Sequence, residues 1–318
     1  MNGYRAPAWL PGGHLQTLYA ALRPPPRAAL ARERWETADG DFIDVDFAGP
    51  PAAARTVVLF HGLEGSSASH YARAIAAHAA AHGWRCALPH FRGCSGEPNR
   101  LPRAYHSGDS DEIDWILRRL RAGRAEALDA EAGLYAVGVS LGGNTLLKWL
   151  GERGAAAGAI VRRAVAVSAP LDLVAAGFAL DRGFNRELYT RVFLATMKRK
   201  ALAKLRRFPG LYDARRVAGA RTLYEFDDLV TAPLHGFRGV RDYWTRASSA
   251  PWLEQVRVPT LVLNALNDPF LPAEALLAAT RRAAPDVVLE FSATGGHAGF
   301  PARGAWLPQR IDAFFSAG

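Results

Sequence analysis

The sequence has few cysteines, few lysines and no long apolar run. Cys86 and Cys94 are its only cysteines in 318 residues, which excludes a disulfide scaffold and a cysteine-rich zinc site. No stretch of 18 or more apolar residues is present, so we expect no segment that spans a bilayer. The first 30 residues contain five prolines but no apolar core of signal-peptide length, and we expect no secretory signal. Together these absences predict a cytoplasmic protein.

Basic charge is abundant but consists almost entirely of arginine. Only 4 of the 39 basic residues are lysines, 30 residues are acidic, and the formal net charge is +9. Such charge is typical of nucleic-acid-binding proteins. Here the arginines are spread along the chain and no recognised nucleic-acid motif accompanies them, so we expect no nucleic-acid partner. A basic cluster between residues 191 and 207 either attracts an anionic substrate or a membrane surface, or is a solvated helix face.

Apolar, strand-like runs alternate with helix-like segments along most of the chain. Strands are expected at 56–62, 84–91, 134–140, 164–170, 260–268 and 287–293, and helices at 70–83, 111–122, 144–154, 272–283 and 306–317. Before them, residues 33–49 are expected to form a hairpin that turns at Asp39-Gly40. Because the strands are apolar throughout and helices lie between them, the pattern predicts an α/β fold. Its central sheet should be mostly parallel and covered by helices on both faces.

The alternation is interrupted between about residues 172 and 250. This segment has helix-like pieces, many arginines and several aromatic residues, and it lies between two expected strands. A loop of such length without structure of its own is uncommon. We therefore expect a single domain over residues 1–318, in which residues 172–250 are inserted as a helical cap over the carboxyl edge of the sheet.

A candidate nucleophile lies in the sequence Gly-Val-Ser-Leu-Gly at 138–142, followed by Gly143. The motif G-x-S-x-G alone is a weak signal, but here an apolar strand ends at Ser140 and a helix is expected directly after it. A sharp strand-to-helix turn exposes the serine hydroxyl, and the flanking glycines allow the backbone to approach closely. The amino end of the helix also favours negative charge that develops there.

A serine hydroxyl needs a base, which is usually a histidine, and the order expected in this fold is serine, acid, histidine. Only His235 and His297 follow Ser140, and His235 falls in the expected cap. His297 lies in a glycine-rich loop after the last expected strand and is the predicted base. Asp268 ends the preceding strand and is the predicted acid that orients the imidazole, with Asp172 as its competitor at the end of another strand.

Two backbone N–H groups are predicted to form an oxyanion hole. One belongs to Leu141, the residue after the candidate nucleophile, and the other to Leu63, in the loop after the first core strand. His61 is expected to brace this loop rather than to transfer protons, and Glu64 to make a local contact.

Several stretches together resemble the YheT-like α/β-hydrolases. The matching stretches are GGHLQT (12–17), HGLEGSSASHY (61–71), FRGCSGEPNR (91–100), YHSGDSDEI (105–113), GVSLGGN (138–144), FDDLVTAPLHGF (226–237), VPTLVLNALNDPFLP (258–272) and GGHAGF (295–300). The resemblance implies one α/β-hydrolase domain with a helical insertion and a serine-dependent carboxylic ester hydrolase activity. The charge-relay positions of the family fall on Ser140, Asp268 and His297.

Two alternatives to hydrolysis remain open at this point. Some members of the family act as acyltransferases, and an H-x-x-x-x-D motif is associated with that activity. His106 and Asp111 match the spacing of this motif. The second alternative is a catalytically silent scaffold that binds a lipid or a partner protein through the basic cap. The aromatic residues of the cap indicate a small ester substrate with an apolar acyl chain. No metal-ligand cluster is visible in the sequence, and neither a metal nor a cofactor is expected.

Overall fold

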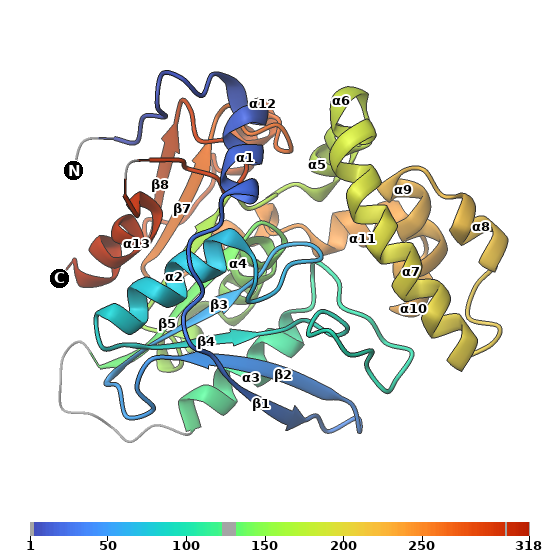
Figure 1. The fold of residues 1–318 in the computed structure, drawn as a ribbon, viewed down its shortest axis with the longest axis horizontal. Coiled ribbons are helices and arrows are strands. Elements are labelled where there is room, and N and C mark those ends of the chain that lie inside the picture. Colours follow the sequence, from blue (N-terminus) through green and yellow to red (C-terminus); the bar gives the residue numbers. More distant parts are fainter. Residues whose placement is uncertain (1–2, 123–131, 303, 318) are drawn as a thin grey trace.

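An eight-stranded sheet forms the centre of the computed structural model, which describes residues 3–122, 132–302 and 304–317 (Figure 1). The strands are β1 (Ala31–Glu36), β2 (Phe42–Ala48), β3 (Arg55–Phe60), β4 (Arg85–Pro89), β5 (Gly133–Val139), β6 (Arg163–Val167), β7 (Thr260–Ala265) and β8 (Val287–Ser292). Their spatial order is β1-β2-β4-β3-β5-β6-β7-β8. Neighbours from β4 to β8 pair in parallel, whereas β2 is antiparallel to both β1 and β4. The predicted α/β fold with a mostly parallel sheet is confirmed.

The antiparallel edge of this sheet is the hairpin expected from the sequence. Ala31 of β1 faces Phe47 of β2 at one end, and Glu36 faces Phe42 at the other. The turn between them contains Gly40, whose φ of +83° is readily adopted only by a residue without a Cβ atom. The Asp39-Gly40 pair therefore lies at the turn, as the sequence predicts.

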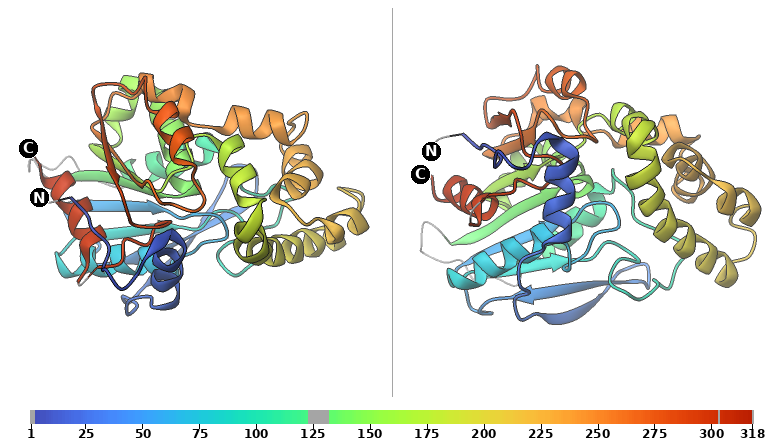
Figure 2. Two further views of the ribbon diagram at one scale, coloured as in Figure 1. Left: turned by 90° about the horizontal axis from the view of Figure 1, so that it is seen from above. Right: turned by 45° about the horizontal axis from the view of Figure 1, so that its top comes forward.

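Helices cover both faces of the sheet (Figure 2). On one face lie α2 (His70–Ala81) and α13 (Trp306–Ser316), and on the other lie α3 (Ser110–Ala122), α4 (Leu141–Arg153) and α12 (Ala273–Ala279). Within β3, Val57 and Leu59 pack toward the first face and Val58 and Phe60 toward the second, as the two-residue period of a strand requires. In these described ranges no helix is both long and apolar enough to cross a membrane.

The segment between β6 and β7 is largely helical and gathers on one side of the sheet (Figure 1). Its helices are α5 (Leu173–Leu180), α6 (Gly183–Asn185), α7 (Arg191–Arg207), α8 (Ala214–Gly219), α9 (Leu223–Phe226), α10 (Ala232–Leu234) and α11 (Val240–Ala247). They bury an apolar cluster of their own, which includes Leu194, Val217 and Trp244. Leu63, from the loop after β3, packs against this cluster and so connects it to the edge of the sheet.

Basic side chains of α7 join this helical segment to the rest of the molecule. Lys200 Nζ lies 2.8 Å from the buried Glu64 Oε2. Lys204 Nζ donates hydrogen bonds to the carbonyl oxygens of residues 101–103, and Arg207 donates one to Asn99 O at 2.7 Å. Burial lowers the pKa of Lys204 to about 8. Part of the basic cluster at 191–207 is thus used in contacts within the protein.

Candidate active site

Ser140 occupies a strained turn between β5 and α4. Its φ of +55° and ψ of −121° are unusual for a residue with a side chain, and such a conformation costs on the order of 1–3 kcal/mol. The turn depends on the flanking glycines: a Cβ atom on Gly138 would lie 2.4 Å from Gly142 O, and one on Gly142 would lie 2.3 Å from Phe60 O. The expected strand–serine–helix geometry is present.

The structure brings Ser140, His297 and Asp268 into one hydrogen-bonded chain. Ser140 Oγ lies 2.9 Å from His297 Nε2, and His297 Nδ1 lies 2.8 Å from Asp268 Oδ2. Because a carboxylate only accepts, Nδ1 carries the proton, which leaves the lone pair of Nε2 directed at the serine hydroxyl. The Asp268 side chain is fully buried, and its other oxygen accepts the Phe270 N–H at 2.8 Å. This is an arrangement that can remove the hydroxyl proton.

Asp172, the competing acid, has a different role in the structure. It precedes α5, and its Oδ1 accepts the N–H groups of Val174 and Ala175 at 2.9 and 3.0 Å. This is the contact of a helix N-cap residue, which satisfies N–H groups that the first turn of a helix leaves without partners. Asp268 is therefore the one of the two acids that contacts His297.

The two predicted oxyanion donors lie in segments packed against each other. A Cβ atom on Gly62 would lie 3.1 Å from Ser140 Cβ, which places the loop after β3 next to the candidate nucleophile. In this loop the N–H groups of Gly62 and Glu64 donate to the hydroxyls of Tyr71 and Tyr105.

Within the described parts of the chain, the N–H groups of Leu63 and Leu141 have no protein acceptor. Both are therefore free to donate to a ligand.

His61 and Glu64 hold the loop that carries Leu63. His61 Nδ1 donates to Gly62 O at 2.8 Å, and its Nε2 accepts the Phe91 N–H at 3.1 Å. Burial lowers the pKa of His61 to about 3, so the ring is neutral and braces the loop as expected. The expectation of a purely local contact for Glu64 is wrong, because its carboxylate pairs with Lys200 of α7.

The loop that carries His297 is supported by an amino-terminal helix whose role was not predicted from the sequence. The GGHLQT stretch forms the first half of α1 (Gly12–Leu22). Thr17 Oγ1 accepts the His297 N–H at 2.8 Å, and Gln16 Oε1 accepts the Gly295 N–H at 2.8 Å and the Asn267 Nδ2–H at 2.9 Å. The helix therefore contacts both loops that carry partners of Ser140. The only signal in the sequence is the motif match, because these residues lie about 280 positions from His297.

The H-x-x-x-x-D pair does not form a unit comparable with this site. The Asp111 side chain is 94% exposed, and an Arg153 Nη2 atom lies 3.7 Å from its Oδ1. His106 is partly buried beside His235, with ring centroids 4.5 Å apart, and its Nδ1 accepts the Gly108 N–H. Burial lowers the pKa of His106 to about 4. The two residues on which the acyltransferase alternative depends therefore lie in different surroundings, one exposed to solvent and one packed among other side chains.

Apolar side chains border His297 on the side of the helical segment. Phe270 packs on the imidazole with ring centroids 4.2 Å apart, and it belongs to a buried cluster with Ala176, Tyr189 and Leu271. Because Ala176 and Tyr189 come from the segment between β6 and β7, this segment supplies part of the apolar surroundings of the site.

Comparison with known proteins agrees with this fold. Residues 55–302 match the sequence model of a family described as alpha/beta hydrolase fold. The protein "Putative esterase YheT" of Escherichia coli (strain K12) is 39% identical over 90% of this chain and 84% of its own length. "Phospholipase ABHD3" of Homo sapiens is 30% identical over 96% of this chain and 75% of its own length.

Solved structures show the same fold at low sequence identity. An esterase (EaEST) from Exiguobacterium antarcticum superposes with a TM-score of 0.58 and 15% identity, over 90% of this chain and all of that one. The Pyrococcus furiosus esterase Pf2001 superposes with a TM-score of 0.57 and 15% identity, over 92% of this chain and 98% of that one. The solved structures support the fold, and the matched family model and the 39% identity show that the chain belongs to the alpha/beta hydrolase fold family and is a YheT-like hydrolase of the esterase type.

Proposed function

We propose that this protein hydrolyses carboxylic esters through an acyl-enzyme formed on Ser140. The observation that carries the proposal is the hydrogen-bonded chain from Ser140 Oγ through His297 to the buried Asp268 carboxylate. In this chain His297 is the general base, and Asp268 fixes its tautomer and stabilises the imidazolium that forms.

In the first half-reaction Ser140 Oγ attacks the ester carbonyl carbon while His297 Nε2 takes the hydroxyl proton. The carbonyl oxygen becomes an oxyanion, to which the N–H groups of Leu63 and Leu141 donate. The bond from the carbonyl carbon to the alcohol oxygen then breaks, and His297 gives its proton to the leaving alcohol.

The second half-reaction uses the same groups. Water gives a proton to His297 Nε2 and attacks the acyl carbon, and the bond to Ser140 Oγ breaks as that oxygen takes the proton back. The acid is released and the resting site is restored. No other group of the protein needs to change its protonation state.

We also propose that the helical segment at 172–250 acts as a cap and that the substrate carries an apolar acyl chain. Phe270, Tyr189 and Leu271 offer apolar surface next to His297, and phospholipase and lipase names occur among the relatives. Each methylene of the acyl chain that becomes buried should favour binding by about 0.8 kcal/mol, which is roughly a fourfold gain.

A cytoplasmic location is proposed on the chemistry of the two cysteines. Cys86 and Cys94 are both buried free thiols, and burial raises the pKa of each to about 12. A chain without disulfides suits a reducing compartment. Cell fractionation with an antibody against the protein would test this proposal.

The proposed activity is tested with p-nitrophenyl esters from acetate to octanoate and a fluorophosphonate probe. We expect hydrolysis of the panel, with kcat/KM rising along the series until the apolar surface is filled, and one covalent label at Ser140. Heat-denatured protein is the control for labelling. Absence of both hydrolysis and labelling would contradict the proposal, and labelling at another serine would contradict the assignment of Ser140.

Replacing Thr17 with valine is expected to lower kcat about tenfold and to leave KM within about twofold. The variant keeps the shape of the side chain but removes the acceptor of the His297 N–H, so the imidazole loses part of its orientation, to which catalysis is sensitive. Steady-state kinetics on one ester would measure the effect. Thr17→Ser retains the hydroxyl and should retain activity; equal losses in both variants would show that Thr17 matters only for packing.

A further inference from the structure

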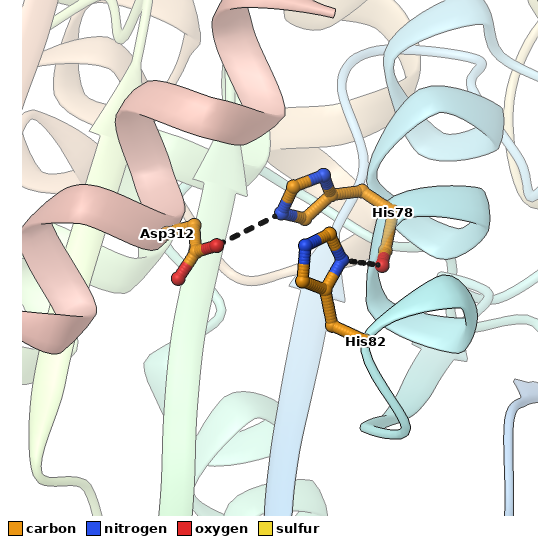
Figure 3. Close-up of side chains that lie close together, drawn as sticks. All are labelled: His78, His82 and Asp312. Carbon is orange, nitrogen blue, oxygen red and sulfur yellow. Dashed lines mark hydrogen bonds and ion pairs between the residues drawn. The ribbon is translucent and has the colours of Figure 1, made fainter.

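A second group of reactive side chains lies on the face of the sheet that α2 and α13 cover. His78 and His82 are one helical turn apart at the carboxyl end of α2, and Asp312 faces them from α13 (Figure 3). One ligand atom from each residue lies within 4.8 Å of the other two. The hydrolase mechanism uses none of these residues, and the sequence alone does not reveal the group because Asp312 lies 234 positions after His78.

We propose that His78, His82 and Asp312 bind a divalent transition-metal ion of the Zn²⁺ class, which joins α2 to α13. Two imidazoles and one carboxylate are ligands that Zn²⁺ prefers, and water can fill a fourth position because His82 is exposed. The proposal concerns a site apart from Ser140 and does not depend on the proposed function.

The orientation of His82 is suited to metal binding. Its Nδ1 donates to His78 O at 2.8 Å, so the proton resides on Nδ1 and Nε2 is left with a free lone pair. Figure 3 shows Nε2 turned toward Asp312 and the His78 ring. Histidines that bind a metal through one ring nitrogen typically donate the other N–H to a backbone carbonyl or a carboxylate, which fixes the tautomer in this way.

The other two ligand atoms already lie close together. His78 Nε2 donates to Asp312 Oδ2 at 3.1 Å, so a zinc ion would displace the Nε2 proton to bind both atoms. The distance between them is close to the separation of about 3.3 Å between two ligands of a tetrahedral zinc ion. The other carboxylate oxygen, Oδ1, accepts the Ser316 hydroxyl at 3.1 Å, which orients the carboxylate. One ring nitrogen of the exposed His82 lies within 4.8 Å of both atoms, so a small shift of this side chain that keeps its hydrogen bond to His78 O would complete the three-ligand site.

One nearby charge opposes the ion. Arg55 Nη1 lies 3.8 Å from Asp312 Oδ1, and the guanidinium packs over the rings of Trp84 and Tyr135. This cation is on the Oδ1 side of the carboxylate, whereas the proposed ligand atom is Oδ2. It should therefore weaken the affinity for the metal without occupying its position.

Isothermal titration of chelator-treated protein with Zn²⁺ tests the proposal. We expect one saturable site per chain and a Tm that rises by a few degrees at saturating Zn²⁺, because the ion binds only the folded state. His82→Gln should weaken binding at least tenfold, and since His82 is exposed this variant is expected to fold. Asp312→Asn should weaken binding similarly.

Glu290→Gln is the matched control, because it removes a carboxylate that pairs with Arg310 of α13 and is not a proposed ligand. This variant should bind Zn²⁺ as the wild type does. Absence of saturable binding at millimolar Zn²⁺ would overturn the proposal. Equal affinity in the wild type and the His82→Gln variant would overturn it as well, because the ion would then lie elsewhere on the molecule.

Discussion

Replacing Ser140 with alanine is expected to lower kcat for p-nitrophenyl ester hydrolysis by roughly 10⁴- to 10⁶-fold. Alanine removes the only atom of the residue that can form the acyl-enzyme, and His297 Nε2 then has no hydroxyl proton to accept. The residual rate should come from the oxyanion donors and from binding, which still act on water attack. Initial rates at saturating ester, with the enzyme concentration raised to compensate, would measure the loss.

Folding of this variant is not expected to change, because alanine loses only the hydroxyl and keeps the backbone turn. Circular dichroism melting curves of the two proteins should therefore coincide within a few degrees. Ser66→Ala, in the loop after β3, is the matched control and should keep activity within about twofold, since its hydroxyl only accepts the Ala68 N–H. A Ser140→Ala variant with the rate of the wild type would exclude the acyl-enzyme on this residue.

The sequence predicts the sheet well because its signals are local. Each strand of the parallel part of the sheet is a short, mostly apolar run. The glycines at 138 and 142 mark a turn in which a Cβ atom at either position would collide with neighbouring backbone. The ends of parallel strands lie along one edge of the sheet, so residues that follow β5, β7 and β8 come to the same edge. The order of the strands and the hydrogen bonds of His297 are given only by the structure.

The supporting contacts around the site could not be predicted, because they join segments that share no sequence pattern. Gln16 and Thr17 each accept one N–H from the His297 loop, about 280 positions away. Glu64 pairs with Lys200, 136 positions later, on a helix whose charges look like a solvated face in the sequence. An aspartate that caps a helix and one that contacts a histidine can both follow a strand, so the sequence favours Asp268 over Asp172 but only their observed partners distinguish them.

Replacing Asp268 with asparagine is expected to lower kcat by roughly 10³- to 10⁴-fold. Asparagine fits the same space, but its NH₂ group can donate to His297 Nδ1. The imidazole proton then resides on Nε2, which can no longer accept the proton of Ser140. The loss of the buried negative charge also removes the group that stabilises the imidazolium. The measurement is kcat on one ester, compared with the Tm of the same preparation.

Asp172→Asn is the matched control, because asparagine caps a helix about as well as aspartate does. It should leave both kcat and Tm nearly unchanged, since the Val174 and Ala175 N–H groups keep an acceptor. The two variants make the same chemical change at the ends of β6 and β7, so a difference between them reflects position alone. A large loss in Asp172→Asn with little in Asp268→Asn would reverse the assignment of the acid and require the loops to rearrange when substrate binds.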